Sequence, residues 1–166
     1  YADFMEEPSF ISQLSGYPRL IVLQTFSKAW ASASVRLGMA FASEEIIGIL
    51  NKIKYPYNIN KLTQDYALKI LKNPDVIKNW AKETVSLRSD VVYELKGFKF
   101  VEKIYPTDAN FVLVKVTDAN DLYTYLTMKG IIVRNRNRVQ LCGNCLRITI
   151  GTKEENEELF KALKKY

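Results

Sequence analysis

The spacing of hydrophobic and polar positions changes along the chain and divides it into two parts near Pro74. In the first part, Arg19–Thr25 and Leu37–Ala42 are short apolar runs, which predict buried strands. Polar capping residues followed by helical spacing then predict two helices. One helix runs from Glu44 to about Lys54 after the cap Ser43, and the other covers 61–71 after the cap Asn60, with Leu62, Tyr66 and Ile70 on one face.

The second part begins with a long predicted helix and continues with strands and shorter helices. Asn73-Pro74 is typical of a helix start, and the helix is expected to end near Lys96, before Gly97. Its length is typical of an element that connects two domains. The remaining pattern predicts strands at Phe98–Ile104, Asn110–Val116, Ile131–Arg134 and Leu146–Ile150, a helix at Asp118–Met128, and a last amphipathic helix after the cap Thr152.

These elements predict an α/β protein in two pieces. Residues 1–73 contain too few strands to bury both faces of a large sheet, so we expect the remainder of a larger domain with a mixed sheet and helices. Residues 74–166 contain enough strands and helices for a complete small α+β domain, with the connecting helix at about 74–96.

Composition narrows the class of protein. The hydrophobic fraction of 48% is ordinary for a globular chain, and no apolar run is long enough to span a membrane. No secretory leader is visible, and the chain opens at Tyr1, through processing or because it is a piece of a longer protein. The net charge of +6 suits small anions as well as nucleic acid. The local cluster of Arg134, Arg136 and Arg138 is more typical of a solvated loop than of a nucleic-acid site.

The absence of histidine and the scarcity of cysteine exclude several chemistries. Without an imidazole, the chain cannot form a Ser-His-Asp triad, a Cys-His pair or a histidine-containing zinc site. Cys142 and Cys145 form a CxxC motif before the strand Leu146–Ile150. We interpret the motif as a plain loop, with a redox pair or half a zinc site as alternatives, and we predict no metal site. Two cysteines and no export signal fit a reducing cytoplasm.

The stretch around Lys28 is the most informative part of the sequence. Lys28 follows a predicted buried strand directly and lies among small residues, which leave room for a flat ligand. Thr25 and Ser27 offer hydroxyl groups, and Arg36 offers a planar guanidinium suited to phosphate. A lysine that attacks a carbonyl carbon is one interpretation of this pattern. The alternative is a surface lysine in a Ser/Ala-rich loop, since exposed lysines are the rule.

A family resemblance favours the first interpretation. The run Thr25–Ser34 (TFSKAWASAS) resembles the cofactor-lysine signature of the class II aminotransferases, which use pyridoxal phosphate (PLP) and have fold type I. Arg36 stands where this family places its phosphate-binding arginine. Segments in the same order along the whole chain resemble the histidinol-phosphate aminotransferases: FSKAWASASVRLGMAFA, KYPYNIN, DANFVLV, GIIVR and CLRITIGT. Ser32, Ala33 and Ser34 depart from the family, which often has glycines there.

The resemblance implies the cofactor-binding residues. Lys28 would form the Schiff base with PLP and then move a proton between the substrate Cα and the cofactor. Ser27 and Arg36, with Thr25, would hold the phosphate, and Tyr1 would hydrogen-bond the phenolic oxygen of the ring. An aspartate for the pyridinium nitrogen would lie just before Tyr1 in the family. A tyrosine would come from a neighbouring subunit.

The resemblance also implies the substrate-binding residues. Arg147 corresponds to the arginine that binds the α-carboxylate, and Arg134 to the second substrate arginine. Together they would bind the phosphate of histidinol phosphate and the carboxylates of glutamate and 2-oxoglutarate. Without the resemblance, a surface ion pair would explain Arg147 equally well. No family role is implied for Arg136 and Arg138.

For the whole protein, the resemblance implies a cytoplasmic homodimeric aminotransferase of histidine biosynthesis, of which this chain is the C-terminal portion. Residues 1–73 would be the end of the PLP-binding large domain. The isolated chain is expected to be inactive, because half of the site would be missing. The alternatives are an aromatic aminotransferase, a threonine-phosphate decarboxylase or, from another class, a non-enzymatic module that binds nucleic acid through Arg134, Arg136 and Arg138.

Overall fold

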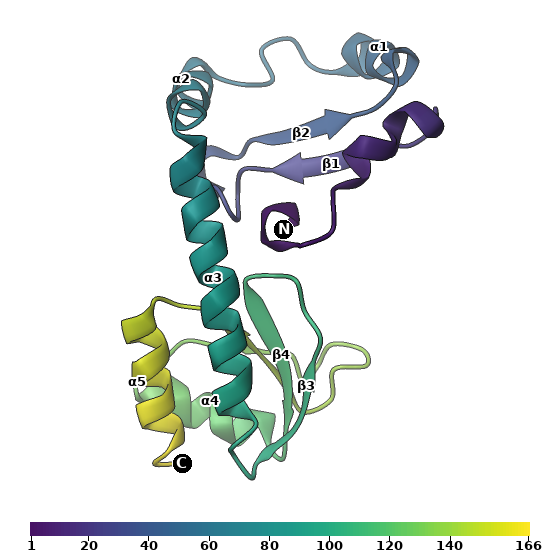
Figure 1. The fold of residues 1–166 in the computed structure, drawn as a ribbon. Helices are drawn as coiled ribbons and strands as arrows, with labels where there is room; N and C mark the ends of the chain where they lie inside the picture. The colour runs from purple at the N-terminus through teal and green to yellow at the C-terminus, as the bar shows by residue number, and fades with distance from the viewer. The chain divides into compact units, whose positions relative to one another are not determined.

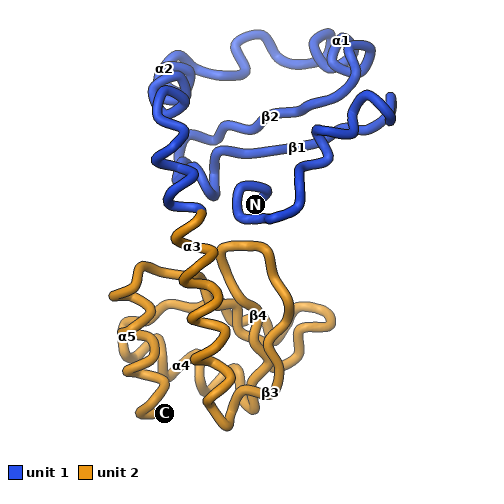
Figure 2. The backbone as a smooth tube through the Cα atoms, viewed as in Figure 1, with its two compact units in different colours: residues 1–81 blue, residues 82–166 orange.

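The computed structural model describes all 166 residues and divides them into two compact units, Tyr1–Ala81 and Lys82–Tyr166 (Figure 2). The boundary falls inside the long helix α3, Pro74–Leu95, which begins and ends within a residue of the prediction. The assignment of 1–73 to a large cofactor domain and of 74–166 to a small domain stays a prediction. None of the helices has the length and apolar content needed to cross a membrane.

The first unit is built on a two-stranded antiparallel sheet. Strand β1, Val22–Thr25, pairs with β2, Gly38–Phe41, and Thr25 lies opposite Gly38. Both predicted helices are present, with the predicted caps. The Ser43 hydroxyl begins α1 and the Asn60 side chain begins α2, each by accepting a backbone N–H of the first turn. The elements of this unit are η1 Ala2–Phe4, η2 Phe10–Gly16, β1, η3 Ala33–Val35, β2, α1 Glu44–Ile53 and α2 Lys61–Ile70 (Figure 1).

The predicted apolar faces of the first unit differ from the observed ones. Leu62, expected on the inner face of α2, is 82% exposed, and α2 instead buries Thr63 and Ala67. Leu23 in β1 is 75% exposed. A sheet of two strands has two unpaired edges and too small a surface to cover all the apolar side chains around it. Helical spacing identified the helix, but it could not identify which face of α2 packs against the rest of the unit.

The second unit is a four-stranded antiparallel sheet with strand order β3-β4-β6-β5. Its strands are β3 Val101–Tyr105, β4 Phe111–Val116, β5 Arg134–Asn135 and β6 Cys145–Thr149, and its two shorter helices are α4 Ala119–Met128 and α5 Lys153–Leu163. Strand β5 begins at Arg134 and not at the predicted Ile131. The N–H of Ile131 donates to the carbonyl of Leu126 at 2.9 Å, so Ile131 belongs to the turn that ends α4.

One face of this sheet carries the hydrophobic core. Val112, Val114 and Val116 alternate along β4 and are at most 2% exposed. They pack with Leu146 and Ile148 of β6 against the C-terminal half of α3 and against α4 and α5. Each such side chain contributes about 1.5–3 kcal/mol on burial. The residues between them therefore point to the opposite face, which carries Phe111, Leu113 and Arg147.

We predict that Thr152→Ala lowers the free energy of unfolding by about 1 kcal/mol. The Thr152 hydroxyl accepts the N–H of Glu155 at 3.3 Å, and the Glu155 carboxylate accepts the N–H of Thr152 at 2.7 Å. The variant loses one half of this capping box, which urea denaturation measures. Thr124→Ala, on exposed α4 surface, is the control and should change the value by less than about 0.5 kcal/mol. Equal effects of the two variants would contradict the role of the cap.

Candidate cofactor and substrate site

Lys28 lies in a turn that closes directly after β1. The N–H of Ala31 donates to the carbonyl of Lys28 at 2.9 Å, and the N–H of Ser32 donates to the carbonyl of Phe26 at 3.1 Å. Phe26 and Ala29 are buried and anchor the turn on either side of Lys28, whose side chain is exposed. The Lys28 Nζ lies 5.9 Å from the centroid of the Tyr1 ring. The fold therefore brings Tyr1 close to Lys28, although the two predicted cofactor residues are far apart in the sequence.

The hydroxyl groups of Thr25 and Ser27 lie together at the end of β1. They are 2.9 Å apart, and the Thr25 hydroxyl also accepts the Ser27 N–H at 3.1 Å. Thr25 further contacts the carbonyl of Leu37, 3.1 Å away, which joins the turn to the residue before β2. Thr25 is thus held on both sides by the chain. Ser27 keeps a rotatable hydroxyl that can turn toward an anion.

Arg36 adopts an unusual backbone conformation close to the lysine turn. Its φ is 53°, in the left-handed region, and Ala31 has φ 48°. Left-handed backbone at residues other than glycine costs about 1–3 kcal/mol and is concentrated at functional sites. The Arg36 side chain is exposed, and its Nη1 donates to the Ala33 carbonyl at 2.9 Å. One edge of the guanidinium is thereby held by the loop that carries it.

Helix α2 supports this loop, which the sequence did not reveal. The Thr63 hydroxyl donates to the carbonyl of Val35, the residue before Arg36, at 3.3 Å. One turn along the same helix, the Tyr66 hydroxyl lies 3.3 Å from the hydroxyl of Ser32. Ser32 is 1% exposed and donates to the carbonyl of Trp30 at 2.6 Å. Only their i, i+3 spacing on one helix face could have suggested that Thr63 and Tyr66 act on the same segment.

The two predicted substrate arginines face each other in the second unit. Arg134 of β5 is the direct register partner of Arg147 of β6, so both side chains lie on the face opposite the core. Two cations in this arrangement destabilise a sheet unless an anion lies between or beside them. The Nε of Arg147 is buried and has no hydrogen-bond partner. Neither arginine takes part in an ion pair of the structure, so two cations without a carboxylate partner lie side by side, and such a pair is suited to carboxylate or phosphate.

Phe111, which the sequence pattern did not single out, contacts this arginine. The Arg147 Cζ lies 4.9 Å from the centroid of the Phe111 ring. Phe111 stands opposite Thr149, two residues beyond Arg147 on β6, so the ring reaches the arginine diagonally across the two strands. The DANF segment contained Phe111, but only the strand register could relate it to Arg147.

The loop between β5 and β6 carries the remaining arginines and both cysteines. Arg138 is exposed, as predicted for a solvated loop, whereas Arg136 is half-buried and its N–H donates to the Cys145 carbonyl at 2.8 Å. The prediction of a loop is confirmed for Cys142, while Cys145 is the first residue of β6. Cys145 is 0% exposed, and burial raises the pKa of its thiol.

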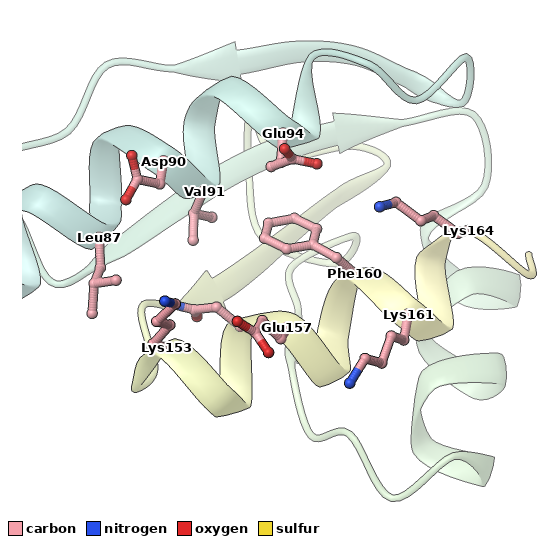
Figure 3. Close-up of a pocket in the computed structure, with 10 residues that line it drawn as sticks. Leu87, Asp90, Val91, Glu94, Lys153, Glu157, Phe160, Lys161 and Lys164 are labelled. Carbon is pink, nitrogen blue, oxygen red and sulfur yellow. The ribbon is translucent and has the colours of Figure 1, made fainter.

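Two hollows in the structure differ in their relation to these residues. A cavity of about 720 Å³ in the first unit is lined by Tyr1 and Thr25, together with Leu23, Trp30 and others. A groove of about 420 Å³ in the second unit lies between α3 and α5, with Phe160 at its floor and charged side chains around it (Figure 3). None of the predicted site residues lines this groove. Of the predicted cofactor residues, Tyr1 and Thr25 line the cavity in the first unit, whereas Ser27, Lys28 and Arg36 do not.

The fold and these residues define a class of protein. The sequence profile described as "Aminotransferase class I and II" matches residues 1–163, and the chain belongs to this family. Among curated proteins, it is 55% identical over 166 residues to the histidinol-phosphate aminotransferase of Bacteroides fragilis and 54% identical to that of Bacteroides thetaiotaomicron. Each match covers 100% of this chain but 48% of the relative, so the chain spans about half the length of the curated relatives it matches.

Solved structures of such enzymes share the fold. The histidinol-phosphate aminotransferase from Clostridium acetobutylicum superposes with a TM-score of 0.90 at 24% identity, covering 98% of this chain and 51% of that one. The L-threonine-O-3-phosphate decarboxylase from Porphyromonas gingivalis gives 0.82 at 24% identity, with 99% and 52% covered. The histidinol-phosphate aminotransferase from Sinorhizobium meliloti, in complex with pyridoxal-5'-phosphate, gives 0.77 at 22%, with 93% and 43% covered. The predicted aminotransferase fold is confirmed.

We predict that iodoacetamide labels Cys142 in the native protein much faster than Cys145. The thiolate is the reactive form, and burial both shields the Cys145 thiol and raises its pKa, whereas Cys142 is partly exposed. Peptide mass spectrometry after timed labelling measures both sites, and labelling in urea is the control, where the two rates should converge. Equal native rates would contradict the buried position of Cys145.

Proposed function

We propose that this chain is part of a PLP-dependent histidinol-phosphate aminotransferase that exchanges an amino group between L-histidinol phosphate and 2-oxoglutarate or glutamate. The observation that carries the proposal is the opposed pair Arg134 and Arg147, neither of which takes part in an ion pair of the structure. Each of these substrates carries a carboxylate or a phosphate that this pair can bind. The identity of 55% to a histidinol-phosphate aminotransferase supports the same substrates.

The residues around Lys28 fit PLP by their chemistry. The cofactor presents an aldehyde, a phenolic oxygen and a phosphate, and the turn offers an exposed amine, a nearby tyrosine, a serine hydroxyl and an arginine. Lys28 would hold the cofactor covalently, Tyr1 would contact its ring oxygen, and Ser27 and Arg36 would bind its phosphate. Thr25 would contribute mainly by orienting Ser27, because the chain already engages its hydroxyl. When bound, PLP supplies an electron sink for the substrate Cα carbanion.

The chain's own part in the reaction follows from these positions. The Lys28 amine, once free, would accept the proton from the substrate Cα and deliver it to the C4′ carbon of the cofactor. Its turn is short and closed by two backbone hydrogen bonds, so the amine moves on its own side chain while the backbone stays fixed. With glutamate, Arg147 would hold the α-carboxylate and Arg134 the distal carboxylate. Histidinol phosphate has no carboxylate, and both arginines would hold its phosphate. The substrate would thus be fixed by its anionic groups while the proton moves.

The remainder of the enzyme would complete the site. The chain spans about half of its relatives, so we propose that the other half supplies the aspartate for the pyridinium nitrogen and further phosphate-binding groups. We also propose a homodimer, with a tyrosine from the neighbouring subunit, working in the cytoplasm. The isolated chain would bind PLP weakly and would not transaminate.

A second reaction on the same site is the decarboxylation of a phosphorylated amino acid. The structural match to L-threonine-O-3-phosphate decarboxylase supports the shared fold, and the arginine pair suits a phosphorylated substrate as well. Product analysis of the full-length protein separates the two: transamination consumes 2-oxoglutarate, whereas decarboxylation releases carbon dioxide and needs no amino acceptor. The identity to curated histidinol-phosphate aminotransferases favours transamination.

We predict that Lys28→Ala abolishes covalent PLP attachment in the full-length protein and lowers kcat by at least about 100-fold, the usual contribution of a positioned general base. Borohydride reduction followed by peptide mass spectrometry should place the reduced cofactor on Lys28 in the wild type and on no residue in the variant. Lys52→Ala, an exposed lysine of α1, is the matched control and should retain the adduct. A reduced adduct in the Lys28→Ala variant would contradict the assignment of Lys28 as the residue that binds PLP covalently.

We predict that Arg147→Lys raises KM for glutamate by about 100-fold, because lysine loses the bidentate geometry. Steady-state kinetics of the full-length enzyme measures the change. Arg138→Lys, in the exposed loop, is the control and should leave KM within about twofold, since exposed charges contribute little. A wild-type KM in Arg147→Lys would exclude this arginine from the substrate site.

A further inference from the structure

We infer that Phe111 is a positioning residue that holds the Arg147 guanidinium ready for the substrate carboxylate. The inference rests on the proposed function, in which Arg147 binds that carboxylate. It starts from the distance of 4.9 Å between the Arg147 Cζ and the centroid of the Phe111 ring. A guanidinium over an aromatic face is attracted by the ring quadrupole and stacks flat on it.

No ion pair and no side-chain hydrogen bond of the structure holds the Arg147 side chain. Its Nε is buried without a hydrogen-bond partner. Its neighbour across the strands on one side is Leu113, which is apolar, and on the other Arg134, which repels it. Arginine has a long, mobile side chain, so ordering it on substrate binding would cost affinity. The Phe111 ring removes most of that cost in advance.

Phe111 is itself held firmly by the strand and the turn before it. The Thr107 hydroxyl donates to the Phe111 carbonyl at 3.0 Å and accepts the N–H of Ala109 at 3.1 Å. The Arg88 Nη1 of α3 donates to the Ala109 carbonyl at 3.0 Å. The turn 107–110 is thus attached to α3 as well as to β4. Because its backbone is held in this way, the Phe111 ring can fix the orientation of the Arg147 side chain, which no hydrogen bond holds.

The contact between Phe111 and Arg147 also affects how a carboxylate would be oriented on the guanidinium. Nε is covered, so the two Nη nitrogens are the donors that remain available to a ligand. A carboxylate bound end-on to both Nη atoms leaves the stacked face of the guanidinium undisturbed. Phe111 would therefore select end-on binding of the carboxylate, which sets the distance between that carboxylate and the reacting Cα.

The test is glutarate binding by the full-length, PLP-loaded enzyme, measured by calorimetry, because glutarate has the two carboxylates of glutamate but cannot react. We expect Phe111→Leu to raise Kd for glutarate, and KM for glutamate, roughly fivefold to twentyfold, with kcat changed far less. Phe111→Tyr keeps the ring and should stay within about twofold of wild type. PLP absorbance should be unchanged in both variants, which separates positioning from loss of the cofactor.

Tyr105→Leu is the matched control, since it removes a ring from the same sheet whose cation partner is Lys103 at 4.7 Å. Its Kd for glutarate should be that of the wild type. If Phe111→Leu lowers the melting temperature, Phe111→Met provides a second non-aromatic variant that fills the same space. A wild-type Kd in the non-aromatic variants would overturn the inference, as would a Phe111→Tyr variant as weak as Phe111→Leu. An enzyme that binds glutarate in this Phe111-dependent way but does not transaminate would overturn the proposed function alone.

Discussion

The antiparallel register between β5 and β6 is the constraint on which the candidate substrate site depends. It sets Arg134 directly opposite Arg147 and so concentrates two positive charges on one face of the sheet. The sheet can tolerate this repulsion because its other face is a continuous apolar core, which includes Val112 and Leu146, both 0% exposed. The stability of the core thereby sustains an arrangement of charges that is unfavourable by itself and that an anionic ligand would relieve.

The candidate cofactor site depends on a short turn that two backbone hydrogen bonds close. The carbonyls of Phe26 and Lys28 accept the N–H groups of Ser32 and Ala31, so the lysine emerges from a fixed point after β1. The left-handed backbone of Arg36 is held in place by the Thr63 hydrogen bond to the preceding residue. To bind a flat, phosphorylated cofactor covalently, a lysine needs a rigid backbone and an amine that is free to move, and the Lys28 turn combines the two.

The sequence predicted the helices and most strands because their signals are local. Ser43, Asn60 and Thr152 each satisfy N–H groups of their own first turn, so the same few residues carry the signal and make the structure. Predictions that depended on contacts with residues far away in the sequence were less accurate. Leu62 has the spacing of a buried residue but is exposed, and Ile131 has the composition of a strand but ends a helix.

For the candidate site too, some features could be predicted from the sequence and others are visible only in the tertiary structure. From the sequence alone, the residue types at Lys28, Arg36 and Arg147 agree with one family, and this agreement was enough to predict the family to which the chain belongs. Only the tertiary structure decided that Arg134 faces Arg147, that Phe111 contacts that arginine, and that α2 donates a hydrogen bond to the loop before Arg36. The physical reason is that strand register and helix packing join residues far apart in the chain, through the sum of many weak contacts that no local pattern records.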